Sequence, residues 1–350
     1  MDDEKFIKDT GGNILCCPKC GSRNLGSSGM HLAYNGERQQ RYQCKSCHMR
    51  TVAPNTYRPP LFDIQEMPRK EMDIDDILNY RGKKFKIKSK EAEFKRLIDV
   101  DIKIDGVIGL CHFGAPHVDD DGTNLHELFG ICDKVNTTEG MFAGNLGDVQ
   151  NNWVGRLSYL YAQQTTTAKE SWVLTEFFLN KLPWLYLVGG NHDVWSGEGD
   201  PLEFIMRSQT GVYQNHGTRL NLKFPNGKKV RVNARHTFKG HSMWNTAHGI
   251  SRAVQMGWRD HILTAGHIHV SGYQVLKDPA TGLISHAIQV GSFKRIDQYA
   301  DKMGLDDRNI FNCPVTIIDP KYGDDDNRLV TTIFDPYEAA DYLTWKRSRK

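Results

Sequence analysis

The sequence predicts an α/β domain preceded by a small zinc-binding module. Two Cys-x-x-Cys pairs lie near the N-terminus, at Cys17–Cys20 and Cys44–Cys47. Between residues 102 and 320, short apolar runs repeatedly end in a small residue followed by Asp, Asn or His. Ligands gather at the carboxyl ends of strands in α/β folds. We therefore expect one binding site where several of these strand ends meet.

Composition is that of an ordinary soluble protein. The 350 residues are enough for two domains, and 39% hydrophobic with 25% charged residues is typical of globular chains. No stretch reaches the apolar length of a membrane span. The acidic start Met1–Lys5 lacks the apolar segment of a secretory signal. These features predict a cytoplasmic or nucleoplasmic protein without a membrane partner.

Charge is unevenly distributed, although the net charge is only +3. Residues 16–58 carry seven Lys or Arg against one acid, and residues 81–96 carry eight against two. Four more basic residues lie in 345–350, so the remainder of the chain is net acidic. Basic segments near both ends of the chain suggest a polyanionic partner. The net acidic remainder suggests a domain that binds cations. The alternative for each basic run is a solvated surface with no partner.

Residues 1–55 are predicted to form a zinc ribbon, whose four thiolate ligands are Cys17, Cys20, Cys44 and Cys47. The two pairs are 23 residues apart, and the segment between them has the pattern of a hairpin with an Asn35-Gly36 turn. A disulfide framework is disfavoured for two reasons. The sequence shows no secretory signal, and four further cysteines would be left without partners. Those are Cys16, Cys111, Cys132 and Cys313. A redox-active Cys-x-x-Cys motif is also disfavoured, because such a motif functions as a single pair and this segment contains two. One structural Zn²⁺ is the expected cofactor of this module.

The ribbon is expected to contact nucleic acid, with protein binding as the alternative, since similar ribbons occur in DNA-associated proteins. Cationic and aromatic side chains around its second strand could bind phosphates or stack on bases. These side chains are Arg38, Arg41, Tyr42 and Lys45.

Residues 56–101 are predicted to be a connector that contains a basic segment, because prolines interrupt its first part. Within it, Met72–Tyr80 and Glu91–Val100 have helical patterns, whereas Lys84–Lys88 alternates charged and apolar residues as a strand does. Its lysines either protect a sheet edge or form a ridge that contacts phosphates. These lysines are Lys84, Lys86 and Lys88.

The main domain is predicted to span residues 102–335. Its expected strands are Val107–Phe113, Gly140–Leu146, Trp184–Val188, the hairpin pair Arg219–Phe224 and Lys229–Ala234, and His261–Ala265. Trp153–Asn180 has a helical pattern, as expected of a crossover connection. Near the last strand end, His267 and His269 are two residues apart, so in an extended segment both can face one pocket. Two imidazoles aimed at one point suit a metal ion.

The order of these motifs resembles that of the calcineurin-like metallophosphoesterase family. The family signature runs D-x-H, G-D-x-x-D/N, G-N-H-D, a lone His, and G-H-x-H. The corresponding segments here are Ala115-Pro116-His117, Gly147–Asn151, Gly190–Asp193, His236 and Gly266–His269. Four of the five are intact and in order, which is far more specific than any one motif. The resemblance covers roughly residues 102–320 and implies a two-sheet sandwich flanked by helices.

The resemblance also implies a site for two divalent metal ions bridged by Asp148. The ligands of one ion would be His117, His269 and the first-block acid, and those of the other would be Asn191, His236 and His267. His192 would protonate the leaving oxygen or stabilise the transition state, with Asp193 orienting it. Imidazole and amide ligands suit manganese, iron, nickel or zinc better than calcium, and manganese is expected. Singly, Asp148 could be a turn residue and His236 an exposed histidine.

One position departs from the family pattern. Ala115 stands where the first-block acid is expected, and its methyl group cannot bind a metal ion. A rival register on Leu110-Cys111-His112 also lacks the acid and would lie within an apolar strand. Asp119–Asp121 follow at the wrong spacing, so rescue by one of them is less favoured. The ion on the His269 side is therefore expected to bind weakly or not at all.

Three explanations fit the alanine: a decayed pseudoenzyme, a natural one-metal variant, and an Asp-to-Ala change made to disable hydrolysis while retaining substrate. A pseudoenzyme would be expected to have lost more than one ligand. We favour the third explanation and with it an active parent enzyme. The simplest alternative is that alanine is the native residue.

Together these features predict a metal-dependent phosphodiesterase that hydrolyses DNA or RNA, most like the DNA-repair exonuclease branch of the family. Other enzyme classes that remain open are a cyclic-nucleotide or small-phosphodiester hydrolase and a phosphoprotein phosphatase. The non-enzymatic alternative is a nucleic-acid-binding pseudoenzyme. Residues 336–350 are expected to form a basic tail, and a homodimer is one option for the assembly.

Overall fold

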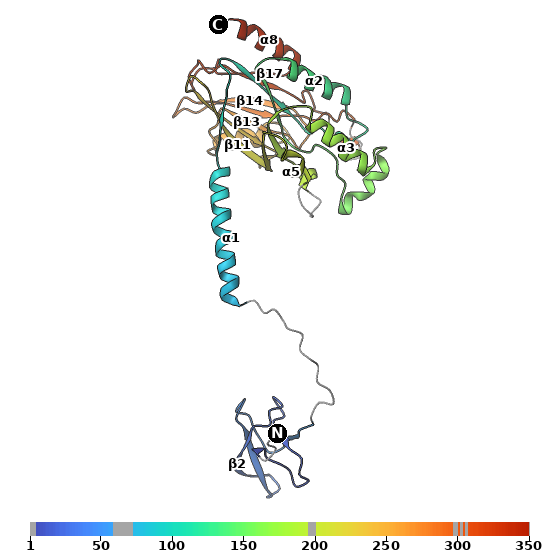
Figure 1. Ribbon diagram of the computed structural model, residues 1–350, viewed down its shortest axis with the longest axis vertical. Helices are drawn as coiled ribbons and strands as arrows, with labels where there is room; N and C mark the ends of the chain where they lie inside the picture. Colours follow the sequence, from blue (N-terminus) through green and yellow to red (C-terminus); the bar gives the residue numbers. More distant parts are fainter. Residues whose placement is uncertain are drawn as a thin grey trace. The chain divides into compact units, whose positions relative to one another are not determined.

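The chain divides into two compact units, Met1–Leu78 and Asn79–Lys350 (Figure 1). The structure, a computed structural model, describes residues 5–58, 73–194, 201–296, 300–301, 304 and 307–349. Among the described residues, no helix is both long and apolar enough to cross a membrane. Each unit is described by itself below.

The small unit is built from short antiparallel strands. Its three-stranded sheet contains β2 (Leu25–Leu32), β3 (Arg38–Cys44) and β4 (Arg50–Thr51), and a second pair contains β1 (Leu15–Cys16) and β5 (Asn55–Thr56). The predicted hairpin is confirmed, with Gly36 at φ 82° in its turn. The amide of Tyr57 donates to the carbonyl of Ile14 at 2.7 Å, so the folded module continues past the expected boundary at residue 55.

The connector contains one long helix, α1 (Ile74–Lys95), where the sequence analysis expected a strand at Lys84–Lys88. The strand prediction was wrong, because lysine, glutamate and alanine favour helix, and a five-residue alternation is not enough to fix a strand. The expected helix at Glu91–Val100 was partly wrong, since α1 ends at Lys95 and β6 (Ile98–Asp101) follows. None of the 22 residues of α1, all of them described, is buried.

The helix changes the expected arrangement of the basic side chains. Residues four apart share one face of a helix, whereas residues two apart do not. Lys84 and Lys88 therefore lie on one side of α1 and Lys86 on another. Lys88 also lies 3.5 Å from Glu91. The expected single ridge of three lysines is not formed.

The large unit contains two six-stranded mixed sheets. The first sheet has the order β10 (Val212–Asn215), β9 (Trp184–Gly189), β8 (Met141–Asn145), β7 (Ile108–Phe113), β16 (Val315–Ile318) and β17 (Val330–Ile333). The second has the order β14 (Gly272–Lys277), β15 (Ile284–Gln289), β13 (Ile262–Ala265), β12 (Lys229–Arg235), β11 (Gly217–Lys223) and β6. The strands and the hairpin predicted in this region are thus confirmed.

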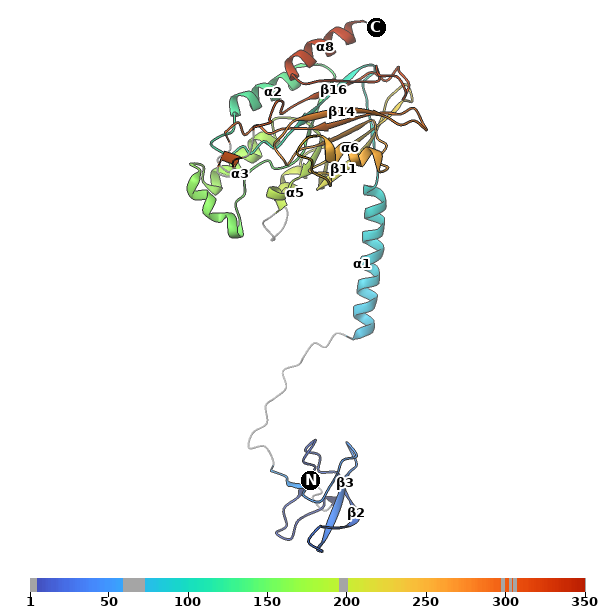
Figure 2. The ribbon, with the colours of Figure 1, turned by 180° about the vertical axis from the view of Figure 1, so that it is seen from behind.

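The two sheets share one core and carry helices on their other faces. Side chains of both sheets, such as Leu110 and Val232, pack together in a single buried cluster. The opposite face of the first sheet packs against α2 (Leu125–Thr137), α3 (Ala168–Leu179) and α8 (Pro336–Ser348). The outer face of the second sheet packs against α6 (His248–Gln255), which Figure 2 shows. The large unit is therefore an α/β fold in which both sheets lie between helices.

The segment expected to be one crossover helix, Trp153–Asn180, forms two shorter pieces. These are the 3₁₀ helix η2 (Gly155–Gln163) and α3. A capping box of Thr167 and Glu170 starts α3, because the two side chains reciprocally bind each other's backbone amides. The sequence contained this start signal, Thr-x-x-Glu, inside the helical pattern.

The C-terminal segment expected to be a basic tail is the helix α8. Ala339, Ala340 and Leu343 pack into the core. Lys346 binds Asp319 at 2.9 Å, and Arg347 donates to the carbonyl of Val107 at 2.8 Å. These two cations therefore contribute to the fold of the large unit, and Lys350 lies outside the described residues.

Two buried histidines are expected to make the large unit sensitive to acid. Burial lowers the pKa of His112 to about 3, and burial with His261 nearby lowers that of His286 to about 4. Both bind hydroxyl groups, His112 that of Tyr186 at 2.7 Å and His286 that of Tyr273 at 2.7 Å. The unfolded chain binds more protons below pH of about 6.5, so stability falls as the pH falls from there toward 4.

We expect His112 alone to remove about 2 kcal/mol of folding free energy between pH 7 and pH 5. Urea unfolding at the two pH values measures this loss. In His112→Asn the difference in unfolding free energy between pH 7 and pH 5 should shrink. His126→Asn, at an exposed position, should leave that difference unchanged. An undiminished difference in His112→Asn would contradict this account.

Candidate metal centre

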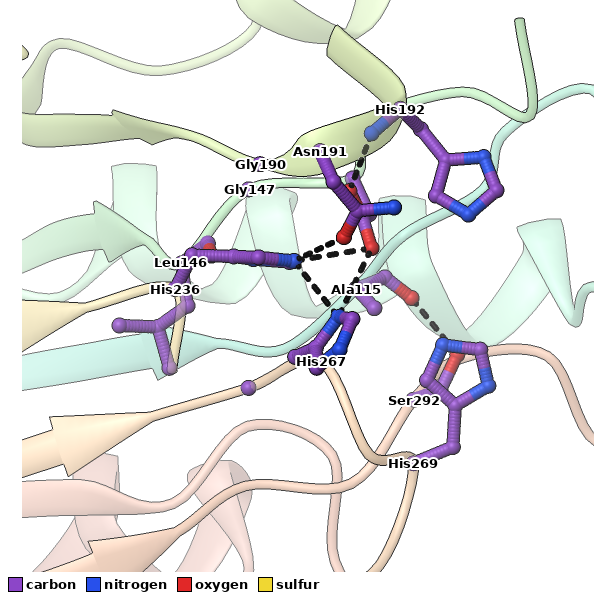
Figure 3. A network of polar contacts seen from close by, with 12 residues as sticks. Ala115, Leu146, Gly147, Gly190, Asn191, His192, His236, His267, His269 and Ser292 are labelled. Atoms are coloured by element: carbon purple, nitrogen blue, oxygen red, sulfur yellow. Dashed lines mark hydrogen bonds and ion pairs between the residues drawn. The ribbon is translucent and has the colours of Figure 1, made fainter. Parts of the chain in front are cut away.

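Polar side chains from both sheets converge on one point at the carboxyl ends of the strands (Figure 3). In the first sheet β7, β8 and β9 are parallel neighbours, and in the second β12 and β13 are parallel neighbours. The residues that follow these five strand ends are His117, Asp148, Asn191 with His192, His236, and His267 with His269. The structure therefore brings together every metal ligand that the sequence predicted.

The first group of donors surrounds the Nε2 atom of His236. Asn191 Oδ1 lies 2.8 Å from it, His267 Nδ1 3.0 Å and Asp148 Oδ2 3.2 Å. Ligands about 2.1 Å from one ion are about 3.0 to 3.4 Å apart, so this spacing fits a single metal ion. His236 Nδ1 donates to the carbonyl of Leu146 at 2.8 Å, which leaves the Nε2 lone pair for the ion.

The second group of donors joins His117 and His269. Their Nε2 atoms are 3.2 Å apart, and ligand atoms of His117, Asp148 and His192 lie within 4.8 Å of one another. Among the described residues, buried His117 Nδ1 has no hydrogen-bond partner. Asp148 faces both groups and is the only carboxylate among these donors. The two groups fit two ions that share Asp148, with a weaker set of donors on this side.

Ala115, where the family pattern led us to expect an acid, lies beside this cluster and is fully buried. Its carbonyl accepts a hydrogen bond from Ser292 Oγ at 2.7 Å. The rival register is disfavoured, because His112 binds Tyr186 and Thr316 inside the core. Of the two registers, only the one on Ala115 therefore lies next to the donors.

The three aspartates that follow His117 are engaged elsewhere. Asp119 accepts from the amide of Asn151 at 2.7 Å, and Asp120 binds Lys294 at 2.9 Å. Asp121 accepts from the Thr165 hydroxyl at 2.7 Å. Metal binding by Asp120 or Asp121 would require these contacts to break.

His192 is oriented by the segment after Asp148 and not by its neighbour Asp193. His192 Nδ1 lies 2.5 Å from the carbonyl oxygen of Asn151, and the ring of Trp153 packs edge-on against it, with centroids 5.2 Å apart. Asp193 instead accepts hydrogen bonds from the amides of Asp148, Val149 and Gly190. The orienting role expected of Asp193 is thus corrected to a role in holding two ligand loops together.

Protonation states favour metal binding. Burial would raise the pKa of Asp148, but the histidines around it, His236 above all, hold it well below its usual range, so Asp148 is a carboxylate. Burial lowers the pKa of His117 and of His192, which keeps both rings neutral. Burial and the nearby Asp148 raise the pKa of Asp193 to about 7. Burial would lower the pKa of His236, but the nearby Asp148 raises it, so a metal ion bound there would displace a proton. The neutral rings of His117 and His192 beside the Asp148 carboxylate are a metal-binding donor set.

Backbone strain is concentrated at this site, a signal that sequence reasoning missed. Five of its residues have a positive φ, namely His117, Asp148, Asn152, His267 and His269. Such conformations are costly for non-glycine residues and cluster at functional sites. A Cβ at Gly190 would lie 2.2 Å from Asp148 Oδ1, so glycine is required for the ligand loops to approach.

A cleft of about 660 Å³ opens over the donors Asp148, His192, His267 and His269. Its wall also contains cations that no sequence motif predicted, together with two acids; these residues are Lys294, Arg295, Arg308, Asp301 and Asp307. Lys294 and Arg295 lie in Gly291–Arg295, directly after a buried strand, and this position is their one signal in the sequence. Two of the cations are paired with acids, Lys294 with Asp120 and Arg295 with Glu127, each at 2.9 Å.

The small unit contains a separate cluster of the four predicted cysteines. Cys17 and Cys47 Sγ are 3.6 Å apart, as are Cys20 and Cys44 Sγ. Tetrahedral Zn²⁺ with bonds of about 2.3 Å places sulfurs about 3.8 Å apart, so the cluster could hold one structural metal ion. Backbone amides, that of Cys47 first, lower the pKa of Cys44 to about 6, which favours the metal-binding thiolate.

The side chains expected to contact nucleic acid differ in their exposure. Arg38 and Lys45 are exposed. Arg41 instead donates to the carbonyl of Ser28 at 3.2 Å, and Tyr42 packs against the small core. Arg38 and Lys45 are thus the more accessible of the four, whereas Arg41 and Tyr42 are half-buried and also support the fold of the small unit.

Cys44→Ser is expected to remove one zinc ion per chain and to unfold the small unit, because metal binding supplies most of the folding free energy of such modules. Metal analysis and limited proteolysis of residues 5–58 measure the two effects. Cys16→Ser is the matched control, since Cys16 is buried nearby but lies outside the cluster. Retention of zinc in Cys44→Ser would contradict the assignment.

No protein-family model matches this sequence, and a comparison with curated proteins finds no match. The chain's own residues are what can be compared with known metal sites. The chain has two mixed α/β sheets, a four-cysteine cluster, and histidine and aspartate groups that could hold metal ions.

Proposed function

We propose that this chain is a calcineurin-like metallophosphoesterase whose large unit hydrolyses phosphodiesters of a nucleic acid. One observation carries the proposal: Asp148 lies between two groups of imidazole and amide donors at the joint carboxyl ends of two sheets. That arrangement suits two ions held on one shared carboxylate. The order of the five sequence motifs supports the same family.

The ions would be held by two sets of ligands: Asn191, His236 and His267 with Asp148, and His117 and His269 with Asp148. When bound, a pair of divalent ions polarises a phosphoryl group and supplies a nucleophilic water at neutral pH. Manganese is the preferred ion, with iron, nickel and zinc as alternatives. Ala115 leaves the second set one carboxylate short, so we propose that this chain binds the second ion weakly and hydrolyses slowly.

His192 is the proposed proton donor to the leaving oxygen. Its Nδ1 is held by the Asn151 carbonyl, which fixes the ring at the wall of the cleft. Burial lowers its pKa, and a bound phosphodiester anion raises the pKa again because a nearby negative charge favours the imidazolium. Lys294, Arg295 and Arg308 orient the phosphate.

A polynucleotide is the proposed substrate because basic side chains lie outside the cleft as well. Arg38 and Lys45 are exposed on the small unit, and Lys84 and Lys88 are exposed on one face of α1. Neutralisation of backbone phosphates releases counterions, so binding should weaken steeply with salt. The competing function is a nucleic-acid-binding protein without catalysis, which Ala115 favours.

His192→Ala, made in an Ala115→Asp background, is expected to lower the rate of oligonucleotide cleavage in Mn²⁺ by about 10²- to 10⁴-fold while metal content stays the same. A labelled oligonucleotide and metal analysis measure both. His126→Ala, at an exposed position, is the matched control and should not change either value. If the protein hydrolyses only small diesters, the proposed nuclease activity is wrong. If it binds two ions and hydrolyses no diester, the alternative of a non-catalytic nucleic-acid-binding protein is favoured.

A further inference from the structure

A second hollow adjoins the metal cleft. It measures about 310 Å³ and is lined mostly by the loop between β12 and α6, with Met243 in its wall and Trp244 at its outer side. Ile268, Val270 and Arg308 line both this hollow and the metal cleft, so the two cavities share a wall. Its volume lies at the lower end of small-molecule pockets, which fits one flat group better than an extended ligand.

The loop that lines the hollow begins at His236, a proposed metal ligand, and exposes two large apolar side chains. Trp244 is 94% exposed and its neighbour Met243 is 80% exposed. A tryptophan held almost entirely in solvent is unusual, since this side chain is among the most buried on average. Adjacent exposed apolar side chains beside a cleft mark a binding surface.

The loop is fixed in place by contacts to the segments around the metal cleft. Arg308 Nη1 donates to the carbonyl of Met243 at 2.8 Å, and the Thr246 hydroxyl donates to the carbonyl of Ser271 at 2.8 Å. The amide of Ser271 donates to the carbonyl of Arg308 at 2.9 Å, which closes the set of contacts. The backbone that carries Met243 and Trp244 is thus held in place, which lowers the part of the entropic cost of binding that comes from the loop.

We propose that Met243 and Trp244 form a stacking subsite for an unpaired base, next to the phosphodiester held in the metal cleft. An indole ring stacks on any nucleobase, and the adjacent Arg308 provides a cation for the backbone. Within a duplex, every base except those of the end pairs has both faces covered by its neighbours, so the indole ring favours an unpaired base and we expect a single-stranded polynucleotide as the substrate. This inference rests on the proposed function and names the form of its substrate.

The test measures the binding of a fluorescent single-stranded oligonucleotide to the full chain by anisotropy at fixed salt. Trp244→Ala should weaken binding about tenfold, because one stacked base contributes about 1 to 3 kcal/mol. Trp244→Phe keeps an aromatic ring and should restore most of the affinity. Trp345→Ala, at another exposed tryptophan on α8, is the matched control and should bind as the parent does.

Two outcomes would overturn the subsite. Either Trp244→Ala binds the single strand as tightly as the parent, which would assign the loop to a protein partner, or the parent binds a duplex as tightly as a single strand. The proposed function fails separately. The Ala115→Asp protein could hydrolyse no diester while its oligonucleotide binding still depends on Trp244. In that case the proposed phosphodiesterase activity is wrong and the proposed stacking subsite is retained.

Discussion

Replacement of Ala115 by aspartate is expected to increase phosphodiester hydrolysis by about 10²-fold or more in the presence of Mn²⁺. The methyl group of Ala115 is fully buried beside His117 and His269, a group that has only the shared Asp148 as carboxylate. A second carboxylate there would offset the charge of an ion that otherwise has two neutral imidazoles. Initial rates on a small diester and on an oligonucleotide measure the gain.

The same substitution should have opposite effects on stability with and without metal. A buried carboxylate that lacks an ion is costly, so metal-free Ala115→Asp should unfold at a lower temperature than the parent. Addition of Mn²⁺ should reverse the order. Ala115→Asn, which has nearly the same shape without the charge, is the control and should give a much smaller gain in rate. Equal rates in the aspartate and alanine proteins would contradict the role assigned to residue 115.

Asp148→Asn is expected to abolish binding of both ions to the large unit and, in the Ala115→Asp background, to remove hydrolysis. Asp148 Oδ2 lies 3.2 Å from His236 Nε2, and Asp148 is common to both groups of donors. An amide keeps the shape but leaves two cations facing each other without a charge between them. Metal affinity should fall by at least about 10²-fold.

Thermal unfolding with and without Mn²⁺ measures this loss. An ion at 100 times its dissociation constant stabilises the folded state by about 2.7 kcal/mol, and Asp148→Asn should lose this gain. Asp133→Asn, at an exposed aspartate in an ion pair with Lys181, is the matched control and should retain it. A full Mn²⁺ response in Asp148→Asn would show that the ion binds elsewhere.

The strands and ligands of the large unit were predictable because their signals are local. Apolar runs such as Trp184–Gly189 are short and end in glycine, and each is followed by its ligand. The parallel order of β7, β8 and β9 then brings His117, Asp148 and Asn191 to one edge. The convergence of the site therefore follows from strand order, which the family resemblance implied and periodicity alone could not supply.

Other features depend on contacts that are distant in the sequence. Lys294 and Arg308 reach the cleft from loops without a motif. His192 is oriented by a carbonyl oxygen of Asn151, and a backbone acceptor leaves no trace in residue type. The strand error at Lys84–Lys88 arose because the five-residue alternation was weighed without the helix-forming residues on both sides.

The most direct test of the central claim is the number of divalent ions bound per chain. Metal analysis after dialysis against Mn²⁺, with the zinc of the four-cysteine cluster counted separately, should give one tightly bound ion in the large unit of this chain. Ala115→Asp should give two, and Asp148→Asn should give none. The same number of ions in all three proteins would contradict a two-metal centre bridged by Asp148.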